Sequence, residues 1–129
     1  MLNLVLVIFS LILNVRDKNM LALTLVVAAG IFIPIGYAGE EWEWFFRCIC
    51  VELMVISLSL IINCQASGIV SFMSGMLILC HLISGFLFVF TDYKEYSYNV
   101  IVPTIETLQI VSLCIFSKTF TERAVKLWT

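Results

Sequence analysis

The sequence has few charged residues and no cluster of basic ones. Only 12% of its 129 residues are Asp, Glu, Lys or Arg and 62% are apolar, whereas about a quarter of the residues in soluble domains are charged. Binding to nucleic acid would require clustered Lys and Arg, so nucleic acid is excluded as a partner. The composition, with a mean hydropathy of +1.09, predicts an integral membrane protein surrounded mainly by the lipid bilayer.

Linkers and catalytic motifs are also missing. No Pro-, Gly- or Ser-rich stretch and no repeat divides the chain, so residues 1–129 are expected to form a single domain. The sequence contains no phosphate-binding loop, Ser-His-Asp set, metalloprotease helix, or haem or flavin signature. We therefore expect no enzymatic activity, no cofactor and no metal site. The five cysteines show no CxxC spacing, which favours buried thiols over a disulfide framework.

Five apolar stretches are present, separated by short polar clusters. They predict an all-α, compact bundle of five transmembrane helices at about residues 2–15, 20–38, 45–63, 69–90 and 100–117. The first stretch is short, because about 14 residues at 1.5 Å each cover only about 21 Å of a hydrocarbon core roughly 30 Å thick. Four spans are therefore the alternative. Asn3, Ser10 and Asn14 share one face of this first helix, which predicts packing of that face against protein.

The distribution of charge orients a five-span bundle. One end collects most of the basic residues, namely Arg16, Lys18, Lys118, Arg123 and Lys126. The other end has only Arg47 and Lys94. The positive-inside rule then places the C-terminus in the cytoplasm and the N-terminus outside. A bacterial inner membrane is the expected location, with a mitochondrial inner membrane and a virion membrane as alternatives.

Tryptophan and tyrosine residues lie at the predicted ends of the spans, where amphipathic rings prefer the lipid headgroups. The expected interfacial anchors are Trp42, Trp44, Tyr93, Tyr96, Tyr98 and Trp128. After residue 117, Phe120, Ala124 and Leu127 recur at helical spacing among charged residues. This pattern predicts a short amphipathic tail at the inner interface, with a plain extension of the last span as the alternative.

Three ionisable residues fall inside predicted spans: Glu52, His81 and Glu106. A carboxylate at mid-bilayer costs about 2.5 to 3.5 kcal/mol even on lenient scales, so such residues point to protein or to a functional site. The predicted topology places all three in the outer half of the bundle, where they could meet. One interpretation is a site that couples to a proton or a cation. The other is a set of neutral, hydrogen-bonded groups that hold the bundle or a partner subunit together.

Prolines and small residues mark further features of the spans. Pro34 is expected to kink the second span, whereas Pro103 is expected in the first turn of the fifth span, where no kink is needed. Small residues at helical spacing permit close helix approach. The predicted helix-packing positions are Ala28, Gly30, Ser71 and Gly75.

Two functions follow from these features. The first is assembly, either as a subunit of a larger membrane complex or as a virus-encoded membrane component, in a homo-oligomer or with a larger membrane protein. It rests on the expectation that five helices carry more polar faces than one chain can bury. The second is a proton- or cation-conducting channel or transport element, holin-like proteins included, that uses Glu52, His81 and Glu106. In size and hydropathy alone, the chain resembles small drug-efflux subunits, subunits of respiratory or antiporter complexes, and phage holins.

Overall fold

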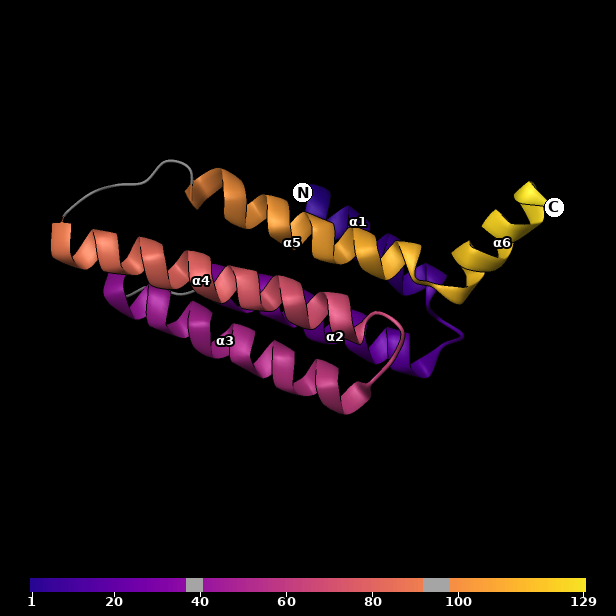
Figure 1. Ribbon diagram of the computed structural model, residues 1–129, viewed down its shortest axis with the longest axis horizontal. Coiled ribbons are helices and arrows are strands. Elements are labelled where there is room, and N and C mark those ends of the chain that lie inside the picture. Colours follow the sequence, from indigo (N-terminus) through magenta and orange to yellow (C-terminus); the bar gives the residue numbers. More distant parts are fainter. Residues whose placement is uncertain (37–40, 92–97) are drawn as a thin grey trace.

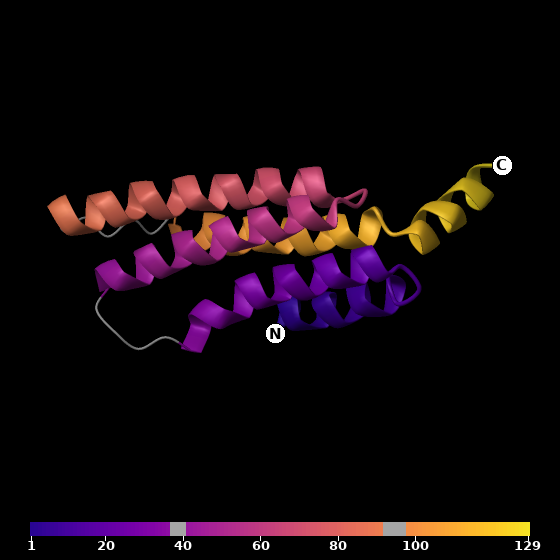
Figure 2. The same cartoon turned by 90° about the horizontal axis from the view of Figure 1, so that it is seen from below.

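The structure, a computed structural model, describes residues 1–36, 41–91 and 98–129, and within these ranges it is helical with no β-strand. The helices are α1 (Leu2–Leu13), α2 (Lys18–Phe32), the 3₁₀ helix η1 (Ile33–Gly36), α3 (Glu41–Ile62), α4 (Ser67–Thr91), α5 (Tyr98–Ile115) and α6 (Lys118–Trp128). Helices α1 to α5 run side by side in alternating directions, and α6 leads away from one end of the bundle (Figures 1 and 2). The predicted all-α fold is confirmed, and each predicted apolar stretch overlaps one of helices α1 to α5.

Three of the described helices are long and apolar enough to cross a membrane. They comprise Glu43–Ile62 within α3, Ser67–Phe90 within α4, and Tyr98–Ile115, which is α5. The first two helices are shorter, with 12 residues in α1 and 15 in α2. At 1.5 Å per residue they measure about 18 Å and 22 Å, less than the roughly 30 Å hydrocarbon core. The structure therefore supports a helical membrane protein in which at least three described helices are long enough to span the bilayer.

The apolar core lies between α2 and the long helices. Met20, Leu23 and Val27 of α2 are at most 1% exposed. They form one cluster with residues of the other helices, including Val55, Val70, Ile110 and Leu113. Helices α3 and α4 are joined by a short turn in which Asn63 adopts a positive φ of 47°, a conformation that asparagine tolerates better than most residues. This turn makes α3 and α4 an antiparallel pair.

Polar residues of the short first helix pack inward, as the sequence predicted. Asn14 Nδ2 donates to the Ser10 carbonyl at 2.9 Å and to the Leu113 carbonyl of α5 at 3.3 Å. Near the start of the helix, Thr107 Oγ1 of α5 donates to Asn3 Oδ1 at 2.8 Å. These contacts attach α1 to α5 at both of its ends.

The bundle buries many of the polar residues on its helix faces. The bundle buries polar residues from all five helices, namely Ser10, Asn14, Thr24, Glu52, Ser59, Ser67, Ser74, His81, Ser84, Gln109, Ser112 and Ser117. Some of them bond one another across helices, as Gln109 Nε2 of α5 does by donating to Ser74 Oγ of α4 at 2.9 Å. These buried polar residues meet neighbouring helices of the same chain.

The proline positions can be compared with the prediction. Helix α2 ends at Phe32 and continues directly as η1, which contains Pro34, so the departure from α-helical geometry in the second span occurs at this proline. The prediction for Pro103 needs correction. Helix α5 begins at Tyr98, two residues before the predicted start, and Pro103 is therefore its sixth residue, beyond the first turn. A proline has no N–H for the carbonyl four residues earlier. The carbonyls deprived of that donor belong to Gly30 and Asn99.

The predicted helix-packing residues behave differently from one another. A Cβ atom added to Gly30 would lie 2.7 Å from Val55 Cγ2, so glycine is what lets α2 approach α3 here. Ala28 is half-buried and packs on the core, and Ser71 bonds Ser59 across α3 and α4. Gly75 was predicted to pack closely, but no atom lies within 4 Å of its Cβ position in the described chain. The space at Gly75 itself is therefore open among the described residues.

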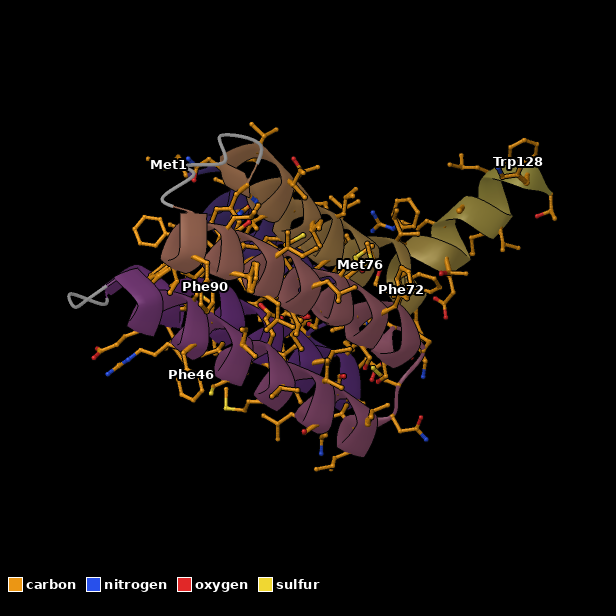
Figure 3. The ribbon with its side chains drawn as sticks, turned by 60° about the vertical axis from the view of Figure 1, so that its left-hand side comes forward. Met1, Phe46, Phe72, Met76, Phe90 and Trp128 are labelled. Carbon is orange, nitrogen blue, oxygen red and sulfur yellow. The ribbon has the colours of Figure 1, made fainter. Side chains whose placement is uncertain are left out.

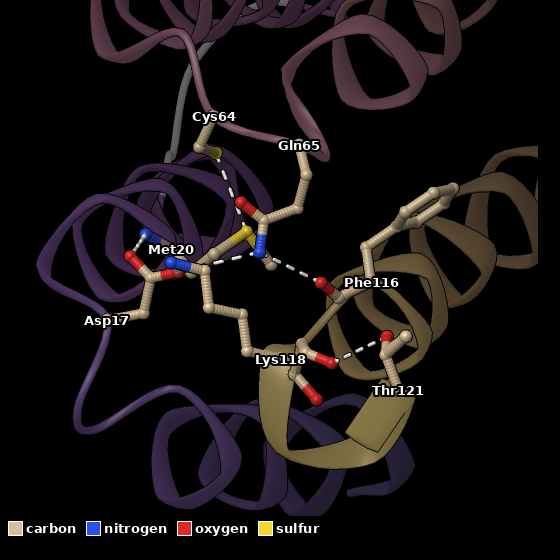
Figure 4. Close-up of polar contacts among 8 residues, drawn as sticks. Asp17, Met20, Cys64, Gln65, Phe116, Lys118 and Thr121 are labelled. Carbon is tan, nitrogen blue, oxygen red and sulfur yellow. Dashed lines mark hydrogen bonds and ion pairs between the residues drawn. The ribbon is translucent and has the colours of Figure 1, made fainter. Parts of the chain in front are cut away.

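The turn between α1 and α2 meets the turn between α3 and α4 and the start of α6 at one end of the bundle. Asp17 caps α2 by accepting from the Met20 N–H at 3.3 Å. Gln65 Nε2 donates to the Phe116 carbonyl at 3.0 Å, and Lys118 Nζ lies 3.9 Å from Asp17 Oδ2 (Figure 4). This set of contacts links all three connections at that end.

The tail is a separate amphipathic helix. Ser117 lies between α5 and α6 and has an extended backbone. Its side chain caps α6 by accepting a hydrogen bond from the Phe120 N–H at 3.1 Å. The alternative of a plain extension of the last span is therefore wrong. Trp128, an expected anchor, is 91% exposed at the end of α6 (Figure 3). Of the other expected anchors, Tyr93, Tyr96 and the side chain of Trp42 lie outside the described residues.

Candidate functional site

Glu52, His81 and Glu106 lie on the wall of one cavity, although they come from three different helices. The cavity has a volume of about 220 Å³. Its remaining wall comes from the end of α2, from η1, and from the first turns of α3 and α5, through Gly30, Ile31, Pro34, Trp44, Cys48, Tyr98, Asn99, Val102 and Pro103. The antiparallel arrangement brings the three side chains to the same level of the bundle, near the end where η1 lies.

Glu52 is the most enclosed carboxyl group of this cavity. The residue is 5% exposed, and its Oε2 atom has no hydrogen-bond partner among the described residues. Its side chain interacts with Ser74 of α4 and is close enough to Glu106 for an electrostatic interaction. Ser74 in turn accepts a hydrogen bond from Gln109 Nε2 of α5 at 2.9 Å. A series of polar contacts therefore connects α3, α4 and α5 beside the cavity. Glu52 Oε2 takes no part in it.

His81 is 4% exposed, and its partner is Tyr98, which was expected in the headgroup region. Its Nδ1 lies 2.7 Å from the hydroxyl oxygen of Tyr98, the first residue of α5. Trp44 hydrogen-bonds to the same hydroxyl group. An indole N–H can only donate, so the Tyr98 oxygen accepts from Trp44. Between Tyr98 and His81, either group can be the donor, depending on the tautomer of the imidazole.

Trp44 and Tyr98 were expected to anchor the protein in the headgroup region. The structure places both on the cavity wall, half-buried, with Phe45 against the Tyr98 ring at 5.6 Å between ring centroids. One feature of the sequence indicated that these two residues could line the cavity. They lie at the outer ends of their spans, close to the level predicted for the three ionisable residues. Nothing in the sequence showed that Tyr98 faces α4.

Glu106 is half-buried and lies one turn after Pro103. The two carbonyls that lose their helical donors to proline, those of Gly30 and Asn99, belong to residues of the same cavity wall. In membrane proteins, such carbonyls must find partners in protein, water or a bound ion. The cavity therefore brings two carboxyl groups, one of them with an unbonded oxygen, next to two residues whose carbonyl oxygens lack the N–H donor of a regular α-helix.

The arrangement can hold a proton or a cation but does not form a compact metal centre. Among the described residues, no three His, Cys, Asp or Glu side chains are grouped so that they could hold a metal ion. A largely apolar cavity with two carboxyl groups on its wall suits a proton shared between groups, or a cation that keeps part of its hydration. No family model, no curated protein and no solved structure matches the chain.

Proposed function

We propose that this chain is a proton- or cation-conducting element of a membrane, and that it takes up its cargo at the cavity lined by Glu52, His81 and Glu106. The observation that carries the proposal is the convergence of these three side chains, from α3, α4 and α5, on one cavity. Each ionisable group within a bilayer is costly, and three in one place are hard to explain by packing alone.

We infer that all five apolar helices cross the membrane. Helix α2 continues into η1, and 15 α-helical residues followed by four 3₁₀ residues extend over about 30 Å, which matches the hydrocarbon core. Helix α1 is shorter, and its polar contacts to α5 support a span that depends on its neighbours. The basic residues Arg16, Lys18 and Lys118 lie around one pocket at the end opposite the cavity. By the positive-inside rule that end is cytoplasmic, so the N-terminus lies outside.

The cavity then faces the outer half of the membrane, and its chemistry fits a positively charged cargo. A bound proton or monovalent cation offsets one of the two negative charges that Glu52 and Glu106 would carry as carboxylates within the membrane. The carbonyls of Gly30 and Asn99 offer further oxygen acceptors, as unwound helix segments do in transporters. The pair of His81 and Tyr98 adds a hydrogen-bonded route by which a proton can move between α4 and α5. A bacterial inner membrane is the location that this topology suits best.

The proposal is tested by ion flux into liposomes that contain the purified protein. We expect a proton, Na⁺ or K⁺ current down an imposed gradient, and a loss of about tenfold or more in Glu52→Gln and in Glu106→Gln, the equivalent of at least about 1.4 kcal/mol. Glu122→Gln is the matched control, because it makes the same chemical change on the exposed helix α6 and should leave flux unchanged. Absence of flux at every pH, or flux that both cavity variants retain, would sink the proposal.

Assembly is the second candidate function, and one observation favours it. Gly68 and Gly75 are seven residues apart on one face of α4, and neither has an atom within 4 Å of its Cβ position in the described chain. Phe72 and Met76 are exposed on the same helix (Figure 3). Small residues on a lipid-facing helix permit close approach of another helix. Native mass spectrometry of the protein in mild detergent tests this function, and a monomer without any retained partner would contradict it.

A further inference from the structure

A second pocket, separate from the proposed cation cavity, lies at the opposite end of the bundle. It has a volume of about 320 Å³ and is formed where α1 ends and where α2 and α6 begin. The residues around it are Leu13, Asn14, Arg16, Asp17, Lys18, Lys118 and Glu122. Helices α3, α4 and α5, the long apolar ones, start or end at this level (Figures 1 and 2). The pocket therefore lies where phospholipid headgroups meet the protein.

The side chains around this pocket carry one net positive charge. Arg16, Lys18 and Lys118 contribute three positive charges, whereas Asp17 and Glu122 contribute two negative ones. Lys118 is 72% exposed and lies 3.9 Å from Asp17 Oδ2, at the limit of an ion pair. Its ammonium group therefore remains available to a second anionic group in the pocket. A single phosphodiester would bring the charge of the pocket to zero.

Asn14 supplies a second and independent sign of a ligand. The residue is 1% exposed, and its Nδ2 group donates hydrogen bonds to the carbonyls of Ser10 and Leu113. Its Oδ1 atom, in contrast, is buried with no hydrogen-bond donor among the described residues. Buried acceptors are almost always satisfied in native proteins, so a donor from outside the chain is expected here. A phosphate group alone offers only acceptors and does not meet this need.

We propose that the pocket binds the headgroup of an anionic phospholipid that combines a singly charged phosphodiester with a hydroxyl group, the chemistry of phosphatidylglycerol. The phosphodiester lies among Arg16, Lys18 and Lys118, and a headgroup hydroxyl donates to Asn14 Oδ1. Basic pockets between helices at the cytoplasmic surface bind anionic headgroups in this way. The bound lipid holds the turn between α1 and α2 against the start of α6. This site is independent of the cation cavity and of what that cavity transports.

Lipid binding to the purified protein in mild detergent, followed by native mass spectrometry, tests the site without any change to the protein. Phosphatidylglycerol is compared with phosphatidylethanol, which has the same charged phosphodiester but no hydroxyl. We expect binding of phosphatidylethanol to be about two- to tenfold weaker, the range for one net hydrogen bond. Zwitterionic phosphatidylethanolamine should bind more weakly than either. Equal retention of all three lipids would overturn the proposal.

Variants and a soluble ligand complete the test. Lys118→Gln should weaken phosphatidylglycerol binding about fivefold, the loss expected for one basic group near an anionic headgroup. Lys126→Gln is the matched control, since Lys126 lies on the same helix but not around the pocket, and it should bind like the unaltered protein. Equal weakening by both variants would show a diffuse charge effect and overturn the site. Glycerophosphoglycerol that binds as tightly as the lipid would overturn the lipid assignment.

Discussion

His81 Nδ1 of α4 and the hydroxyl oxygen of Tyr98 of α5 lie 2.7 Å apart, beside two carboxyl groups. The bond connects the middle of one long helix to the first residue of the next, across the connection 92–97. It also fixes the orientation of the imidazole ring against the cavity, because the Tyr98 hydroxyl is itself held by Trp44. The stability of this corner and the chemistry of the cavity therefore depend on the same hydroxyl group.

Removal of that hydroxyl in Tyr98→Phe should destabilise the protein. The change leaves Nδ1 of a buried imidazole without its partner, which costs about 1 to 3 kcal/mol. Thermal unfolding in detergent measures the loss. Trp44→Phe is the control, because it removes a donor to Tyr98 but leaves the bond to His81, and its effect should be smaller. An unchanged melting temperature in Tyr98→Phe would show that the bond contributes no stability.

Alanine at Gly30 and at Gly75 should have opposite effects. In Gly30→Ala the new Cβ would meet Val55 Cγ2 at 2.7 Å, and overpacking of this kind costs about 1 to 3 kcal/mol. In Gly75→Ala the Cβ enters open space, and replacement of a helical glycine stabilises by up to about 1 kcal/mol. The two melting temperatures should move in opposite directions. A Gly75→Ala variant as unstable as Gly30→Ala would contradict the described surroundings of α4.

Ser74 and Gln109 should be energetically coupled. Gln109 is 2% exposed and its Nε2 donates to Ser74 Oγ at 2.9 Å, next to Glu52. A double-mutant cycle of Ser74→Ala and Gln109→Leu measures this coupling, which should lie between about 0.5 and 3 kcal/mol for directly bonded residues. Strictly additive effects on unfolding would show that α4 and α5 do not share this bond.

Two methionines provide a matched test of which side of the bundle is the core. Met20 is fully buried, whereas Met76 is 41% exposed on α4. Met20→Ala should cost about 2 kcal/mol, the low end of the range for soluble cores, because lipid also solvates the unfolded side chain. Met76→Ala should be close to neutral, since lipid fills the space. Equal losses in both variants would place Met76 at a helix interface.

The helices themselves could be predicted from the sequence because the two features that indicate them are local. These features are runs of apolar residues and polar residues at helical spacing. Runs of apolar residues require backbone hydrogen bonds within each segment, and these are available only in a helix. Polar residues recurring at helical spacing showed which face of each helix avoids lipid, so Glu52, His81 and Glu106 were found as candidates before their positions were known. The sequence by itself thus determined a helical membrane protein with ionisable groups on its inward faces.

Only the tertiary structure decided what those faces meet. In a membrane, lipid is as apolar as the side chains, so hydrophobicity does not set how helices rotate or which ones approach. Close packing sets both, and it placed Val55 against Gly30 but left Gly75 without a neighbour. The same packing turned Tyr98 toward His81 and put the Gly30 and Asn99 residues around the cavity. These pairs join residues far apart in the chain, and no local pattern encodes them.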